Sequence, residues 1–177
     1  MRTAIYPGTF NPITNGHLDI LYRAMVLFDK VIIAVAQDHY QNTLFTLEER
    51  LGFIQEETKN IPNVEAQFFS GLLVDIIEEH DACAIIRGLG TVADFEYEFQ
   101  LASLNRKLVP QVETIFFMTS INYSFLSSNI VNNIAALKGC IKGLVPLAVE
   151  NALNQKFSEQ INPVRERRKK NNENTGI

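Results

Sequence analysis

The sequence has no tryptophan, only two cysteines, and no apolar run that approaches the length of a membrane span. A spanning helix needs roughly 20 consecutive apolar residues. The short apolar stretch at the N-terminus is broken by Pro7 and Gly8, which argues against a signal peptide. Cys83 lies in an expected buried strand and Cys140 in an expected turn, and neither a CxxC pair nor a Cys/His cluster indicates a structural zinc site. We therefore expect a cytoplasmic protein with reduced thiols and no membrane association.

The composition that is present suits an ordinary globular domain. The 177 residues are 46% hydrophobic and 20% charged, with a net charge of −4. Segment 165–177 holds five basic residues and two acids, which leaves −7 on the rest of the chain. A negative body argues against nucleic-acid binding as the main function. We expect one domain over residues 1–160 and a basic, disordered tail over residues 161–177.

Short apolar runs rich in β-branched residues alternate with longer segments of helical period. The pattern predicts strands at residues 3–6, 31–36, 64–69, 82–86 and 113–118. It predicts helices at residues 16–28, 46–60, 72–80, 91–108, 127–137 and 145–157. This order predicts an α/β fold with a five-stranded parallel sheet and helices on both faces.

The loops that follow the strands should meet at one edge of this sheet. Ligands of open α/β sheets bind beyond the carboxyl ends of the strands, at the topological switch point. The segments expected there are residues 6–17, 37–45, 87–91 and 119–129. Thr46 followed by Glu49 is a capping-box signature for the helix that begins nearby. Glu48, Glu49 and Arg50 are interpreted as helix-start and surface charges.

The first of these loops, YPGTFNPITNGH at residues 6–17, combines several turn formers with a histidine. Gly8 permits backbone conformations that bring N–H groups close to a ligand, and Asn15-Gly16 makes a second turn. His17 then lies in the first turn of a helix, where unpaired N–H groups and the helix dipole favour an anion. A neutral imidazole there can donate one N–H to a phosphate oxygen. Taken residue by residue, a histidine that only decorates a helix start is an equal alternative. The combination of Gly-Thr-Phe with Thr-x-Gly-His after a strand is much less ordinary.

The segment Thr14-Asn15-Gly16-His17 resembles the T/HxGH signature of the nucleotidylyltransferase superfamily. Other segments, in the same order, resemble the bacterial phosphopantetheine adenylyltransferases: FTLEER (45–50), IIRGL (85–89), VADFEYEFQLASLNRKL (92–108), ETIF (113–116) and YSFLSS (123–128). This resemblance implies a Rossmann-like domain that transfers AMP from ATP to 4′-phosphopantetheine. The products would be dephospho-coenzyme A and pyrophosphate, in coenzyme A synthesis. It also implies Mg²⁺ with ATP, coenzyme A as a related ligand, and a homohexamer.

The same resemblance implies roles for individual positions. His17 and Arg87 would be catalytic, His17 by donating to developing charge and Arg87 by gripping phosphate. The ATP-binding residues would be Thr9, Phe10, His17, Gly88, Leu89, Gly90, Glu98, Tyr123, Ser124, Phe125, Leu126, Ser127, Ser128 and Asn129. The residues on the acceptor side would be Thr9, Gln41, Leu73 and Arg87. No residue is expected to bind a metal directly.

Plainer alternatives exist for some of these residues. Arg87 could be a surface ion-pair partner, and Glu98 could belong to a solvated helix face. Ser127 and Ser128 could be ordinary N-caps, a role compatible with phosphate contact.

The chain departs from the family pattern at several positions of the expected site. Asn11 stands for the usual Asp, Gln41 for a Lys and Gly90 for an Arg, while Asn129 and Asn132 replace a hydroxyl and a basic residue. Gln41, Gly90 and Asn132 each remove positive charge, and a charged hydrogen bond contributes on the order of 1.5–3 kcal/mol. Three hypotheses follow: a working adenylyltransferase whose efficiency these changes leave open, a catalytically weak paralogue that binds nucleotide or coenzyme A, and an adenylyltransferase for another phosphorylated acceptor. We prefer the first, because the long segment 92–108 also follows this one family.

Overall fold

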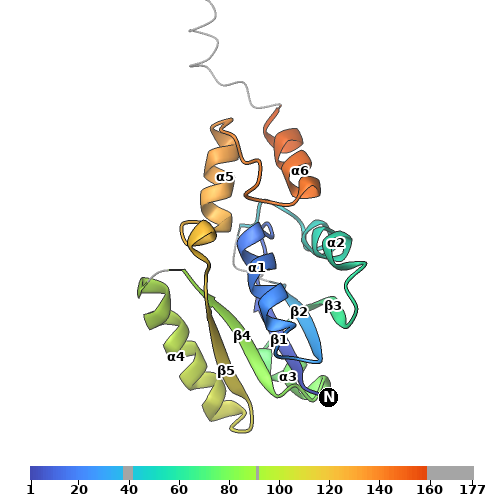
Figure 1. Cartoon of the computed structure of the whole chain (residues 1–177), viewed down its shortest axis with the longest axis vertical. Coiled ribbons are helices and arrows are strands. Elements are labelled where there is room, and N and C mark those ends of the chain that lie inside the picture. Colours follow the sequence, from blue (N-terminus) through green and yellow to red (C-terminus); the bar gives the residue numbers. More distant parts are fainter. Residues whose placement is uncertain (38–41, 91, 159–177) are drawn as a thin grey trace, which may run out of the picture.

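Five parallel strands form one sheet with helices on both faces in the computed structural model, which describes residues 1–37, 42–90 and 92–158 (Figure 1). The strands are β1 (Thr3–Gly8), β2 (Lys30–Ala36), β3 (Val64–Phe69), β4 (Ala84–Leu89) and β5 (Glu113–Met118), in the spatial order β3-β2-β1-β4-β5. The helices are α1 (Asn15–Ala24), α2 (Leu47–Thr58), α3 (Leu73–Glu79), α4 (Val92–Leu108), α5 (Ser128–Ala136) and α6 (Leu147–Ser158). A short 3-10 turn at Ile121–Tyr123 was not expected. The predicted fold class is confirmed.

Two hydrophobic cores lie on opposite faces of the sheet, because successive residues of a strand point to opposite sides. Ile33 and Ile86 belong to the core that packs against α1, α2, α5 and α6. Their neighbours Ile32 and Ile85 belong to the core that packs against α3 and the segment after α4. Burial on both faces explains why the central strands are near-continuous apolar runs.

β1 and β4 separate toward their carboxyl ends, and this opening positions the site. They pair only at Ala4 with Ala84 and at Ile5 with Ile85, whereas β1 pairs with β2 as far as Gly8. The connections from β1 and β4 lead to strands on opposite sides, β2 and β5. This is the topological switch point at which the sequence predicts the ligand site.

Two strands extend further than predicted, which moves site residues from a loop into the sheet. β1 reaches Gly8 and β4 reaches Leu89, so Arg87 and Gly88 are strand residues. The prediction ended β4 before its first charged residue, but pairing with β5 continues through Leu89. The prediction that Cys83 is buried in a strand is wrong, because β4 begins one residue later and Cys83 is exposed.

No helix in the described ranges has the length and apolar character needed to cross a membrane. Gln41 and the predicted basic tail over residues 161–177 lie outside the described residues. The division of the chain into a domain and a tail therefore stays a prediction.

Candidate functional site

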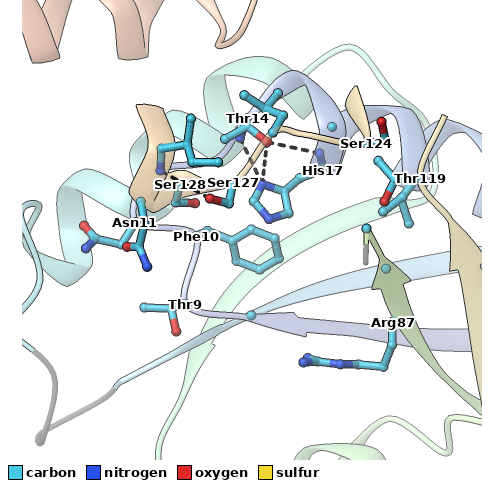
Figure 2. Close-up of a pocket in the computed structure, with 18 of the residues that line it drawn as sticks. Thr9, Phe10, Asn11, Thr14, His17, Arg87, Thr119, Ser124, Ser127 and Ser128 are labelled. Carbon is cyan, nitrogen blue, oxygen red and sulfur yellow. Dashed lines mark hydrogen bonds between the residues drawn. The ribbon is translucent and has the colours of Figure 1, made fainter. Parts of the chain in front are cut away.

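A pocket of about 700 Å³ opens at the carboxyl ends of β1 and β4, between the start of α1 and the segment that leads into α5 (Figure 2). Most of the residues that the sequence assigns to the substrates line it: Thr9, Phe10, His17, Arg87, Gly88, Gly90, Ser124, Phe125, Leu126, Ser127, Ser128 and Asn129. Asn11, Thr14 and Thr119 line it as well. Motifs far apart in the sequence thus meet in one cavity.

Four of the assigned residues within the described ranges are not among those that line the pocket. Leu89 is buried at the end of β4, and Leu73 packs against the core on the α3 side of the sheet. Tyr123 ends the 3-10 turn before α5. Glu98 lies on α4 and contacts Arg87. Direct contact of these side chains with a substrate stays a prediction.

Thr14 and His17 form a reciprocal cap at the start of α1. The Thr14 hydroxyl accepts from the His17 backbone N–H at 3.4 Å, and the Thr14 backbone N–H donates to His17 Nδ1 at 3.0 Å. Because Nδ1 accepts this bond, the proton of the neutral ring lies on Nε2. Burial, assisted by the positive charge of Arg87, lowers the pKa of His17 to about 4. His17 therefore offers the pocket a neutral N–H donor near pH 7.

Arg87 is held in a fixed orientation at the pocket wall. Its Nε donates to Glu98 Oε2 at 2.6 Å, Nη2 donates to the other carboxylate oxygen, and Nη1 donates to the Pro7 carbonyl at 2.9 Å. Pro7 has no N–H to donate to a neighbouring strand, and its carbonyl serves the guanidinium. The Glu98 carboxylate occupies the Nε/Nη2 edge, so the far edge of the guanidinium can face a phosphate. The alternative that Glu98 lies on a solvated helix face is wrong, because it is 8% exposed.

The turn after β1 is strained and is anchored by side chains from distant segments. Phe10 has a left-handed φ of 47°, which costs a non-glycine residue about 1–3 kcal/mol. Asn11 Oδ1 accepts from the Phe45 N–H at 3.1 Å, and Asn132 Nδ2 donates to the Asn11 carbonyl at 3.0 Å. The expectation that position 132 faces the substrates is therefore not met: Asn132 anchors the turn and is not among the residues that line the pocket.

Arg50 is a site residue that was missed, and its assignment as a surface charge is wrong. It is 3% exposed, and its Nη1 donates to the Thr9 carbonyl at 2.6 Å and to the Ala36 carbonyl at 3.0 Å. The helical period contained the signal, because Arg50, Ile54 and Thr58 recur every four residues and form the buried face of α2. A charge on a buried stripe indicates polar partners in the interior.

Ser127 and Ser128 open α5 beside the pocket, as predicted. Ser127 is the N-cap, and its Oγ accepts from the Ile130 N–H at 3.2 Å. Ser128 Oγ donates to the Pro12 carbonyl at 2.7 Å. The Ser127 hydroxyl thus accepts a capping bond and the Ser128 hydroxyl donates to the turn after β1, while the N-terminal N–H groups of α5 add positive potential for an anion.

The donor set of the pocket suits anions better than it suits a metal held by the protein. Within the described ranges, no group of three or more His, Cys, Asp or Glu side chains could hold a metal ion. The described lining of the pocket contains no Asp or Glu. Its polar groups are hydroxyls, amides, the His17 imidazole and the Arg87 guanidinium, which donate hydrogen bonds to phosphate.

Known proteins similar to this chain share its fold and most of its length. The family model described as cytidylyltransferase-like matches residues 5–134. A phosphopantetheine adenylyltransferase of Moorella thermoacetica is 54% identical over 157 residues, 89% of this chain and 98% of that protein. A phosphopantetheine adenylyltransferase of Carboxydothermus hydrogenoformans is 52% identical over 160 residues, which are 90% of this chain and 99% of that protein. The crystal structure of a lipopolysaccharide core biosynthesis protein from Thermoplasma volcanium has a TM-score of 0.52 and 21% identity, covers 68% of this chain and 98% of that one, and supports the fold alone.

Proposed function

The chain belongs to the cytidylyltransferase-like family and, within it, to the phosphopantetheine adenylyltransferases, and we propose that the pocket at the switch point is where it carries out their reaction. The chain transfers AMP from ATP to 4′-phosphopantetheine in coenzyme A synthesis. Both relatives carry a name that specifies this acceptor, and each covers about nine tenths of the chain at more than half identity. The hypothesis of another phosphorylated acceptor has no comparable support.

The reaction needs alignment more than it needs a strong base. An oxygen of the acceptor phosphate forms a bond to the α-phosphorus of ATP. The bond from that phosphorus to the oxygen that bridges to the β-phosphate breaks, and pyrophosphate leaves. Because the attacking oxygen is already anionic and pyrophosphate is a stable anionic leaving group, no proton has to be removed or supplied. Catalysis then depends on positioning and on stabilising the charge that develops.

The observation that carries the proposal is the position of His17, which lines the pocket at the start of α1 with its ring fixed by Thr14. Thr14 fixes the ring with its proton on Nε2, and burial keeps the ring neutral. Such a group strengthens its hydrogen bond to a phosphoryl oxygen as negative charge accumulates, without exchanging its proton. Arg87 would hold the acceptor phosphate with its far edge, and Thr9 would face both substrates. Phe10 would face ATP, and residues 124–129 would wrap the nucleotide.

We propose that Mg²⁺ enters as part of the ATP complex. Magnesium keeps several waters and is commonly held by substrate phosphates with few protein ligands. The hydroxyl and amide oxygens around this pocket fit that arrangement, because they can bond the waters of a hydrated ion. Bound with ATP, the ion would neutralise phosphate charge, while His17 and Arg87 orient the reacting groups.

We also propose a homohexamer that works in the cytoplasm. Several large apolar side chains of α4 are exposed in the single chain: Phe95, Tyr97, Phe99, Leu104 and Leu108. An exposed apolar surface of this kind is typical of contacts between copies. The two cysteines, Cys83 and Cys140, are free thiols, which suits a reducing compartment.

Pyrophosphate release tests the function directly. Purified protein with ATP, Mg²⁺ and 4′-phosphopantetheine should release pyrophosphate only when the acceptor is present. His17→Ala should lower kcat by about 10²–10³-fold, the usual effect of removing one donor to a transition-state oxygen. His80→Ala, outside the pocket, should leave the rate unchanged. Release by the unmodified chain no faster than by His17→Ala would instead support the weak paralogue.

A further inference from the structure

We propose that Arg50 is a positioning residue that fixes the substrate-facing turn after β1 by holding the Thr9 carbonyl from behind. Arg50 is buried in α2 and is not among the residues that line the pocket. It therefore acts on the substrates through Thr9 and Phe10. The expected effect of Arg50 on the reaction rate rests on the function proposed above. Its expected effect on the conformation of the turn does not depend on that function.

A single nitrogen of Arg50 connects the ends of two neighbouring strands. Nη1 donates to the Thr9 carbonyl at 2.6 Å and to the Ala36 carbonyl at 3.0 Å. The ladder between β1 and β2 ends at Gly8 and Val35, so Thr9 and Ala36 are the next residue on each strand. Arg50 thus continues the connection between the strands by one residue, at the point where β1 gives way to the pocket.

The carbonyl that Arg50 holds controls the conformation of Phe10. The Thr9 carbonyl and the Phe10 nitrogen belong to one planar peptide unit, so a rotation of this unit changes ψ of Thr9 and φ of Phe10 together. Phe10 has a left-handed φ of 47°, which persists only where the surroundings determine it. Holding the carbonyl therefore holds Phe10 in this conformation.

Phe10 transmits this orientation to His17. The Phe10 ring meets the His17 ring edge to face at a centroid distance of 5.2 Å (Figure 2). It meets the Tyr6 ring in the same way at 5.5 Å. A Phe10 that left the left-handed region would remove one wall of the His17 site. One continuous line of contacts therefore runs from Arg50 on α2 through Thr9 and Phe10 to His17, the residue that would donate a hydrogen bond to the substrate phosphate.

The structural part of the test compares two variants of α2 without any substrate. Arg50→Met keeps an unbranched stem and removes the donors. Ile54→Ala, one helical turn further on the same buried face, weakens the packing of α2 without touching Thr9. In crystal structures of the unliganded variants, we expect Phe10 to leave the left-handed region in Arg50→Met and to keep it in Ile54→Ala. An unchanged Phe10 in Arg50→Met, or the same change in both variants, would overturn the proposal.

The kinetic part separates positioning from general stabilisation. At a temperature where all variants are folded, Arg50→Met should lower kcat by about 10–100-fold, because small displacements of a substrate-positioning group have effects of this size. The KM for ATP should change less than threefold, and Ile54→Ala should keep kcat within twofold. The loss of kcat in Arg50→Lys should be at least fivefold smaller than the loss in Arg50→Met, since one ammonium group can donate to both carbonyls.

The outcomes of the two parts are distinguishable. Equal losses of kcat in Arg50→Met and Ile54→Ala would reduce Arg50 to a stabilising role and overturn the proposal. If the unmodified chain released no pyrophosphate, the proposed function would fail. The crystallographic comparison would still decide whether Arg50 positions the turn.

Discussion

His17 links the chemistry of the pocket to the stability of the chain. Its pKa is about 4 in the folded state, against about 6.5 for an unperturbed histidine. Between these two values the unfolded chain binds one proton more than the folded chain. The contribution of His17 to the free energy of unfolding is therefore fully present above about pH 6.5, and it is lost as the pH falls toward about 4.

Replacement of His17 by glutamine should remove this pH dependence. Between pH 7 and pH 5, we expect the unmodified chain to lose about 2 kcal/mol more free energy of unfolding than His17→Gln loses. Urea unfolding at the two pH values measures the difference. Equal losses in the two proteins would contradict a His17 that is neutral in the folded chain.

Glu98 has a different role from the one expected of it, because it orients a cation. Its carboxylate holds one edge of Arg87 and leaves the other edge for phosphate. Glu98→Gln keeps the shape but removes the charge-assisted pair, a loss on the order of 1.5 kcal/mol or about tenfold in binding. We expect the KM for 4′-phosphopantetheine to rise by about that factor.

The neighbouring Glu96 provides the matched control for this variant. It lies on the same helix and is exposed, so Glu96→Gln changes the net charge equally without touching Arg87. The KM of Glu96→Gln for 4′-phosphopantetheine should stay within twofold of that of the unmodified chain. Equal effects of the two variants would assign the change to long-range charge rather than to the orientation of Arg87.

At the scale of single residues, the sequence predicts the role of a residue whose partners are close in the sequence. It misses the role of a residue whose partner is distant in the sequence. His17 lies in a short motif with its capping residue, Thr14, and could be recognised there. Arg50 bonds to Thr9, which is 41 positions away, and Glu98 bonds to Arg87 from another element. Only the fold brings such pairs together.

At the scale of elements, α1 and β4 approach so closely that Gly88 has no room for a side chain. A Cβ atom at Gly88 would lie 2.4 Å from Cδ1 of Ile20 on α1, and Ile20 is 4% exposed. Because α1 carries His17 and β4 carries Arg87, this contact joins the two elements that carry the groups we assign to the phosphates.

A double-mutant cycle at this contact tests that close approach. Gly88→Ala should cost about 1–3 kcal/mol of unfolding free energy through overpacking. Ile20→Val alone should cost about 0.5–1.5 kcal/mol. In the double variant the missing Cδ1 makes room for the new methyl group, so we expect a total loss smaller than the sum. Denaturant unfolding measures each term, and strictly additive losses would contradict the steric account.

Every helix start was predicted to within two residues, and the ends of β2, β3 and β5 were predicted to the residue, but β1 and β4 extend two and three residues beyond their predicted ends. The range of the interactions explains the two errors. The cap of α2 depends on Thr46 and Glu49, three residues apart, and both of its reciprocal bonds are present. The end of β4 depends on pairing with β5, so it extends through Arg87 to Leu89 in spite of the charge. Local chemistry can be recognised in one segment, whereas a ladder needs both strands.

At the scale of the whole molecule, alternation of strands and helices was enough to predict the sheet and the edge that carries the pocket. Packing within the described part of the chain does not cover the exposed apolar residues of α4. Phe95 and Phe99 have ring centroids 5.8 Å apart, and Phe99 is 56% exposed. Such a surface gains from burial against another copy, at roughly 25 cal/mol for each Å² of apolar area.

The assembly that we propose has a direct test at this surface. Light scattering should give about 120 kDa for the unmodified protein, six times the 20.0 kDa chain. Phe99→Asp places a charge in the apolar surface of α4, and burying it would be unfavourable, so we expect a smaller species. Val26→Asp, at a position that is 80% exposed after α1, should keep the full mass. A 20.0 kDa species for the unmodified chain, or an unchanged mass for Phe99→Asp, would exclude assembly through α4.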